Sequence, residues 1–134
     1  RGGAVVEFAL VAPVLLLLVC AVIDFARFFV VSLSLTAAVR DGARLAATLA
    51  NPLDAAQAAA ARSRVVAGFV AFGGAPLTAG GVSVVPTLVG GVVNTVTVQV
   101  TNYRFTPITP MASSLGLGTV TISRTAVFRW ERAS

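Results

Sequence analysis

The sequence predicts an α+β protein with one long N-terminal hydrophobic helix, a second helix and a small antiparallel β-sheet. Three observations lead to this prediction. Sixteen consecutive residues, 8–23, carry no charge. Apolar residues then recur at helical spacings of three and four to about Ala50. After Phe72 glycine pairs appear, and the hydrophobic period changes to two, which is the period of a β-strand.

The first helix is predicted to run from Ala4 to Ala50, with a kink or a loosened turn at Pro13. Its apolar start provides the roughly 20 residues that a membrane span needs. Asn51-Pro52 ends it, because the residue before a proline is pushed out of the α region. At 1.5 Å per residue this helix is roughly 70 Å long. Half of it must project into a membrane, into other subunits, or into both in turn.

A cleaved signal peptide is the alternative interpretation of the apolar run. The run is longer than the core of such a peptide, ends without a small-residue cleavage site and continues directly into helical patterning. We therefore predict two domains. Residues 1–50 form a transmembrane and polymerisation helix, and residues 51–134 form a surface domain that contains a helix and an antiparallel sheet.

The second helix is predicted from Asp54 to about Val70, after a Pro-Leu-Asp start signal. On the first helix, Asp24–Arg27 and Asp41–Arg44 are opposite charges three residues apart, which meet on one helix face. Three strands follow, with one covered face and one polar face, and Gly90-Gly91 forms the first hairpin turn. The predicted strands are Val82–Val89, Val92–Thr101 and Thr119–Trp130, and residues 105–111 and 116–118 form a structured loop between the last two.

Composition excludes several classes of function. Only 11% of the residues are charged, and the ten arginines that give a net charge of +5 are spread along the chain, so we expect no nucleic-acid partner. There is no histidine, one cysteine and five separated carboxylates, which leaves little to build a catalytic, cofactor or metal site. We therefore expect that this protein is not an enzyme. The helix hydroxyls of Ser32, Ser34, Thr36 and Thr48 are expected to face a groove or to bond backbone carbonyls.

Glu7 stands at the head of the apolar run. A carboxylate deep in a bilayer costs about 2.5–3.5 kcal/mol on insertion scales, and such groups are candidates for a function. We expect Glu7 to pair with a cation of another chain, a terminal amine first and Arg1 or another arginine second. The alternative is that Glu7 only marks the edge of the membrane.

The segment Arg1-Gly-Gly-Ala-Val-Val-Glu7-Phe8 is similar to the class III prepilin signal, in which a basic residue and glycine precede a glutamate and an aromatic residue. The stretch from Ala4 to Arg44 resembles the TadE/TadG-like pilins of tight-adherence secretion systems. It shares with them a Val-Glu-Phe-Ala-Leu opening, an acid-Phe-small-Arg step and an Arg-acid-Gly-Ala-Arg end. Residues 103–107 and 126–131 look like the closing strands of that family.

This resemblance implies a pilin-like lollipop that the inner membrane holds by its first helix. A prepilin peptidase would cut between Gly2 and Gly3, and Glu7 would pair with the N-terminal amine of a neighbouring subunit. The Tad assembly machinery would then extract the chain into an extracellular helical homopolymer. If Arg1 is instead the mature terminus, the spacing between the cut and the acid is lost.

The predicted function is that of a structural pilin subunit of a bacterial type IV-like filament, or fimbrium, for adhesion or surface contact. The alternatives are a minor pseudopilin that primes or tips the filament, and a membrane-anchored binding module unrelated to pili. The residues expected in the packed core of the polymerisation helix are Phe8, Leu10, Val11, Pro13, Val14, Leu15, Leu17, Leu18, Ile23, Phe25, Phe28 and Phe29.

Overall fold

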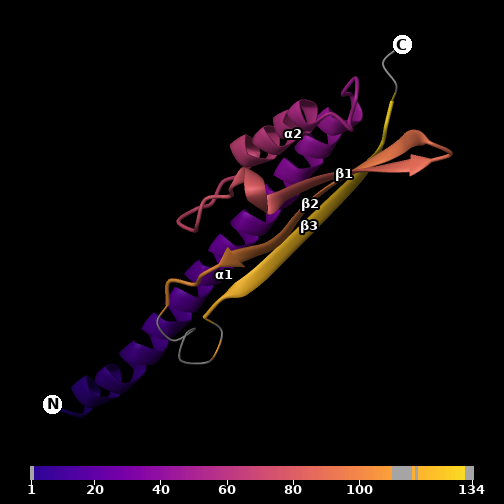
Figure 1. The fold of residues 1–134 in the computed structure, drawn as a ribbon. Helices are drawn as coiled ribbons and strands as arrows, with labels where there is room; N and C mark the ends of the chain where they lie inside the picture. Colours follow the sequence, from indigo (N-terminus) through magenta and orange to yellow (C-terminus); the bar gives the residue numbers. More distant parts are fainter. Residues whose placement is uncertain (1, 110–115, 117, 132–134) are drawn as a thin grey trace.

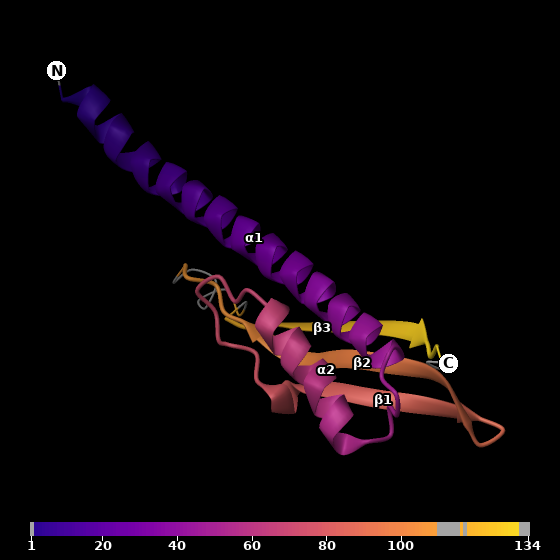
Figure 2. The same ribbon diagram turned by 90° about the horizontal axis from the view of Figure 1, so that it is seen from above.

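The computed structural model describes residues 2–109, 116 and 118–131. The helix α1 (Gly3–Ala47) is followed by α2 (Ala55–Gly68), the short 3₁₀ turn η1 (Ala79–Gly81) and the strands β1 (Val82–Val89), β2 (Val92–Phe105) and β3 (Val120–Arg129). The N-terminal half of α1 extends away from the rest of the chain, whereas α2 and the sheet lie beside its C-terminal half (Figures 1 and 2). The α+β prediction, with its lollipop shape, is confirmed.

Leucine and alanine, which favour helices, fill much of α1, and the helix continues through Pro13 without interruption. No side chain of residues 3–23 is buried, but from Asp24 onward buried residues recur every three or four positions. The first half of α1 therefore has no buried side chain, and its second half forms part of the hydrophobic core. The predicted division into domains at residues 50 and 51 stays a prediction.

α1 ends at Ala47, earlier than the predicted Ala50. The Thr48 amide donates to the Leu45 carbonyl over 3.1 Å, and the Thr48 hydroxyl donates to the same oxygen over 2.9 Å. These contacts close the last turn before the proline. The chain then reverses into α2, where the Asp54 carboxylate caps the helix by accepting a hydrogen bond from the Ala56 amide.

α2 lies directly on α1 because small residues line the contact. A side-chain Cβ on Gly42 would approach the Val65 methyl carbon to 2.2 Å, so only glycine fits there. The predicted pair Asp41–Arg44 is wrong: Asp41 instead forms an exposed ion pair with Arg64 of α2, 3.8 Å apart. Sequence spacing could not show that a second helix would bring a competing guanidinium group to this carboxylate.

The three strands form an antiparallel sheet in the order β1-β2-β3. Gly90 and Gly91 have φ values of 61° and 81°, the left-handed conformation that the predicted hairpin turn needs. β2 extends four residues beyond the predicted Thr101, because a bulge at Asn102 absorbs one extra residue and pairing then continues. Asn102 has a φ of 59°, and its amide donates to the Ser123 hydroxyl oxygen.

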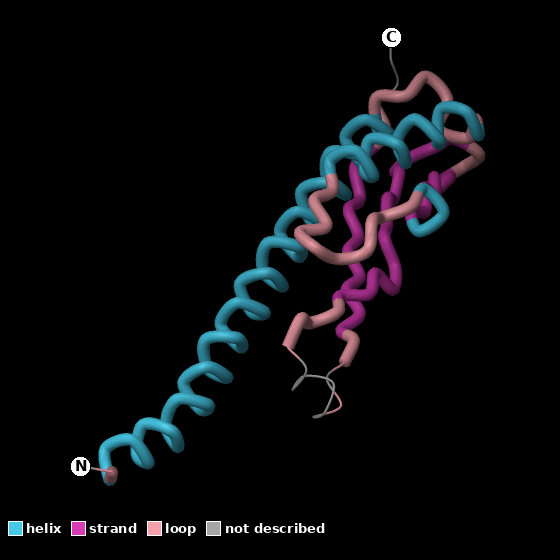
Figure 3. Tube along the Cα trace, turned by 90° about the vertical axis from the view of Figure 1, so that its left-hand side faces the viewer, coloured by secondary structure: helices cyan, strands magenta, loops and turns pink. Residues whose placement is uncertain are grey.

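The core lies between the inner face of the sheet and the second half of α1. Figure 3 shows the strands running beside this half of the helix. Leu35 and Val39 of α1 are fully buried, and they belong to the same hydrophobic cluster as Val96 and Val98 of β2. At the far end, the Trp130 indole donates to the carbonyl of Leu49 and the Glu131 amide donates to that of Ala47. The end of β3 is thereby fixed to the end of α1.

Replacing Leu35 by alanine should destabilise the domain by about 2–5 kcal/mol, because it opens a cavity at a fully buried site. Leu33, two residues away on the same helix, is 68% exposed, so Leu33→Ala should leave stability nearly unchanged. Urea unfolding of the detergent-solubilised chain, followed by Trp130 fluorescence, measures both. Equal effects of the two substitutions would contradict the placement of this helix face.

Candidate functional site

The first functional feature is residues 3–23 of α1, none of which is buried. We call this segment the uncovered half of α1. Phe8 and Leu10 are exposed over 72% and 74% of their surfaces, and residues 14–19 are exposed at every position, so no face of the helix is covered. Of the residues predicted for the polymerisation core, those exposed are Phe8, Leu10, Val11, Pro13, Val14, Leu15, Leu17, Leu18, Ile23, Phe25 and Phe29. Phe28 differs: it packs on the domain core, with its ring edge against Phe105.

The residues predicted for processing, Gly2 and Gly3, and for charge pairing, Glu7, lie at the start of the uncovered half of α1. α1 begins at Gly3, and Gly2 occupies the cap position, where its carbonyl accepts a hydrogen bond from the Val6 amide. The Glu7 side chain is exposed and forms no ion pair with any residue that the structure describes. Arg1 lies outside the described residues, so its pairing with Glu7 stays a prediction.

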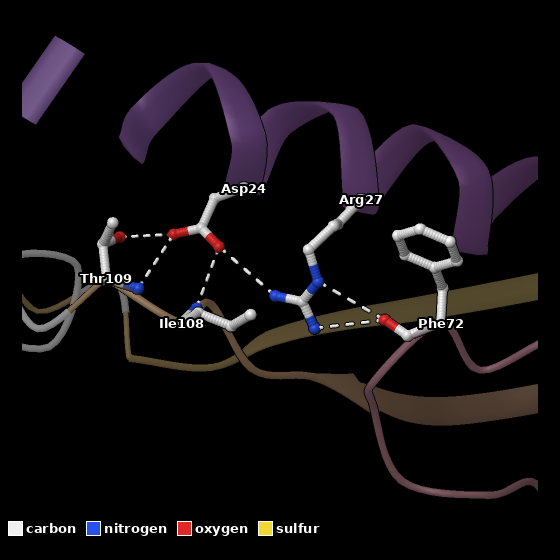
Figure 4. Close-up of polar contacts among 5 residues, drawn as sticks. All are labelled: Asp24, Arg27, Phe72, Ile108 and Thr109. Carbon is white, nitrogen blue, oxygen red and sulfur yellow. Dashed lines mark hydrogen bonds and ion pairs between the residues drawn. The ribbon is translucent and has the colours of Figure 1, made fainter. Parts of the chain in front are cut away.

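The second feature is Asp24, where the uncovered half of α1 ends. Its carboxylate accepts hydrogen bonds from the amides of Ile108 and Thr109, over 2.9 and 3.0 Å, and from the Thr109 hydroxyl (Figure 4). Both residues belong to the loop that follows β2. Asp24 thus ties a loop more than 80 residues away in sequence to the middle of α1.

Arg27, one turn further along α1, holds a second loop. Its Nη1 donates to Asp24 over 3.3 Å, while Nε and Nη2 both donate to the Phe72 carbonyl, over 3.3 and 3.2 Å (Figure 4). The guanidinium group also lies over the Phe105 ring, 5.5 Å from its centre. Gly73 has a φ of 80°, and a Cβ there would lie 3.2 Å from Nη2, so glycine lets this loop approach. We call the Asp24–Arg27 pair with these contacts the loop clamp.

The hydrogen bonds of the loop clamp favour the charged form of Asp24. Burial raises the pKa of Asp24, but the hydrogen bonds from Thr109, Ile108 and Arg27 outweigh it and hold the pKa below its ordinary value of 3.8. The carboxylate is therefore ionised at neutral pH and pairs with a permanently charged guanidinium. Because every donor comes from the same chain, this charge pair holds the domain together and leaves little capacity for a ligand.

The helix hydroxyls are used structurally. Thr36 and Thr48 donate to backbone carbonyls, as predicted. Ser34 accepts a hydrogen bond from the Val70 amide, and Arg124 of β3 donates to the hydroxyl oxygens of Ser32 and Thr36 over 2.6 and 3.1 Å. Within the described ranges, no group of three or more His, Cys, Asp or Glu side chains is placed to hold a metal ion.

The comparison with known proteins concerns both the uncovered half of α1 and the loop clamp. The family model described as TadE-like protein matches residues 2–44, a segment that includes Glu7, Asp24 and Arg27. This segment of the chain is TadE-like. The match covers α1 as far as Arg44 and does not extend to α2 or the sheet. α1 is also long and apolar enough to cross a membrane. No curated protein and no solved structure matches the chain.

Sequence analysis found the Asp24–Arg27 pair but not its partners. The predicted contact between the two side chains is confirmed at 3.3 Å. Ile108, Thr109 and Phe72 were missed, because they contribute mainly backbone groups, which any residue type can supply. The glycine pair after Phe72 was a signal of a turn, although nothing in it indicated that an arginine would bind there.

Asp24→Asn should destabilise the domain by about 1–3 kcal/mol, since an amide replaces a charged acceptor of three loop donors. Asp41→Asn is the matched control, because its ion pair is more than half exposed and should contribute less than about 1 kcal/mol. Hydrogen exchange at Ile108 and Thr109 should accelerate only in Asp24→Asn.

The effect of this substitution should depend on pH. A carboxyl group whose pKa is lowered on folding stabilises the folded state above its unfolded pKa, and loses that contribution as the pH falls through the folded value. The difference in free energy of unfolding between the wild type and Asp24→Asn should therefore be largest above about pH 4 and should shrink in more acidic solution. A difference that grows with acid would contradict the lowered pKa.

Proposed function

We propose that the chain is a structural pilin subunit that polymerises through α1 into a Tad-type extracellular filament for adhesion or surface contact. The observation that supports this most is the uncovered half of α1, which is apolar around its whole circumference. A helix that is apolar on all sides must be buried, either in lipid or among other protein segments. Before assembly the inner membrane supplies this cover.

Apolar exposure continues beyond the reach of the membrane. Phe29 and Leu33 are exposed over 50% and 68% of their surfaces, although both follow the loop clamp along α1. If the span ends near Ile23, these residues lie roughly 9–15 Å past its end, at 1.5 Å per residue. Lipid tails cannot cover them there, so protein must. This continuous stripe favours a filament subunit over a chain that only anchors a soluble module.

Copies of the same helix fit both parts of this surface. Burying one large apolar side chain contributes about 1.5–3 kcal/mol, and α1 offers more than a dozen. Surfaces that repeat head to tail build an open helical filament unless the rotation closes. We propose self-association into such a homopolymer, after cleavage between Gly2 and Gly3 by a prepilin peptidase and extraction by the Tad assembly machinery.

Glu7 supplies the register of this assembly in our proposal. It is the single carboxylate of the uncovered half, and it points outward without a partner among the described residues. In the filament it pairs with a cation of a neighbouring subunit, a terminal amine or Arg1. Such a pair forms only when adjacent helices are staggered correctly, so it selects one packing of otherwise featureless apolar helices.

Glu7→Ala and Glu7→Gln should both abolish most filament yield while membrane insertion is kept, because each leaves an uncompensated cation at a cost of about 3–5 kcal/mol. Glu131→Gln, a charge removed from the opposite end of the domain, is the control and should assemble normally. Sheared surface filaments and membrane fractions are quantified together for all three variants.

Two results would count against the proposal. Normal filament yield from Glu7→Ala would show that this carboxylate only marks the membrane edge. Wild-type filaments in which the chain is a trace component, rather than the bulk, would show that it primes or tips a polymer of another subunit. N-terminal sequencing of the filament band locates the cut in the same sample.

A further inference from the structure

We infer that the loop clamp holds a second, shallow membrane contact, in which the exposed side chains of Ile108, Phe72 and Phe25 reach the headgroup region of the bilayer that α1 spans. We call these three side chains the apolar collar. The inference rests on α1 as a membrane span and not on polymerisation. Its partner is a phospholipid bilayer surface.

The depth of the collar follows from the contacts of the loop clamp. Residues 4–23 form a span of about 20 residues, or roughly 30 Å, which matches the hydrocarbon thickness of a bilayer. Asp24 therefore lies at its outer boundary. The Ile108 amide is bonded to Asp24, and the Phe72 carbonyl to Arg27, so the two loop backbones are held within about one helical turn of that boundary (Figure 4). Ile108 is the deeper of the two.

The collar side chains have the chemistry of interfacial anchors. Ile108 is exposed over 69% of its surface, Phe25 over 64% and Phe72 over 54%. They come from three segments that the fold gathers at one end of the domain, around the point where α1 leaves it (Figure 2). Aromatic and large apolar residues at this level bury surface in the outer part of the bilayer without crossing it.

Charge is arranged to suit phosphate groups at the same end. The exposed Arg104 precedes the last residue of β2 and lies four residues before Ile108 in the sequence. Among the described carboxylates, Asp24 is used by the loop clamp, and Glu7 lies near the start of α1, at the other end of the membrane span. Asp41, Asp54 and Glu131 lie towards the opposite end of the domain, around the α1–α2 connection and the end of β3. An anionic headgroup layer therefore meets one free guanidinium and no exposed carboxylate of these residues.

Lipid explains the collar better than a second copy of the chain does. The collar is continuous with the span, so it faces the bilayer whenever α1 is inserted. The exposed stripe through Phe29 and Leu33, by contrast, lies above the membrane and is available to neighbouring subunits. Extraction of a subunit would then have to break the collar contact as well as withdraw the helix.

Tryptophan quenching by brominated lipid tests this directly. Full-length Ile108→Trp and Phe72→Trp are reconstituted into phosphatidylcholine–phosphatidylglycerol vesicles with bromine near the headgroup end of the acyl chains. Val89→Trp, at the β1–β2 hairpin far from the span and 62% exposed, is the matched control. The wild-type chain gives the baseline from Trp130. All three sites are more than half exposed, so the variants should fold, which circular dichroism verifies.

Quenching should remove most of the emission added at position 108, a smaller part of that added at 72, and none of that added at 89. Equal quenching at 108 and 89 would overturn the inference. A blue-shifted but unquenched emission at 108 would also overturn it, because it would show that another protein surface covers the collar. Neither result depends on filament yield, so failure here is distinguishable from failure of the proposed pilin function.

Discussion

The loop clamp is the interaction on which the rest of the structure depends. Among the described residues, Asp24 and Arg27 are the two charged side chains that the fold buries, and each holds one loop of the domain against α1. An unpaired charge in this position would be strongly destabilising, so the pair and its loop partners must form together. The clamp therefore decides where along a single 45-residue helix the domain begins.

This division places the two halves of α1 in different environments. Before Asp24, no side chain of α1 is buried among the described residues, and this half of the helix needs lipid or other helices. After Arg27, one face of the same helix forms the core with the sheet, while Phe29 and Leu33 stay open on another face. We propose that this one element serves as anchor, as core and as contact surface. Such a chain can leave a membrane only if another apolar environment replaces the bilayer, which is why we interpret it as a filament subunit.

Much of this fold could be predicted because hydrophobic periodicity and the glycine and proline residues that end helices and strands are local features of the sequence. The charge-free run, the helical spacing before Asn51 and the glycine pair at 90–91 fixed the element types, and β1 was placed with its observed bounds. The bulge at Asn102 and the Asp41–Arg64 pair were not predictable, because both depend on which segments meet in space. The site divides in the same way: Glu7, Asp24 and Arg27 were visible as charges beside an apolar run, whereas the backbone donors at 108–109 carry no sequence signal.

The division of α1 at the loop clamp is tested most directly by a nitroxide scan of residues 18–36 of the full chain in vesicles, with Cys20 replaced by alanine. Accessibility to oxygen reports lipid, and accessibility to a water-soluble nickel chelate reports water. The account predicts lipid exposure on every face through Ile23. Beyond the collar residue Phe25 it predicts alternating protection and water exposure, with Leu35 protected and Leu33 exposed to water. Helix-periodic protection before Ile23, or lipid exposure that continues to Leu33, would contradict it.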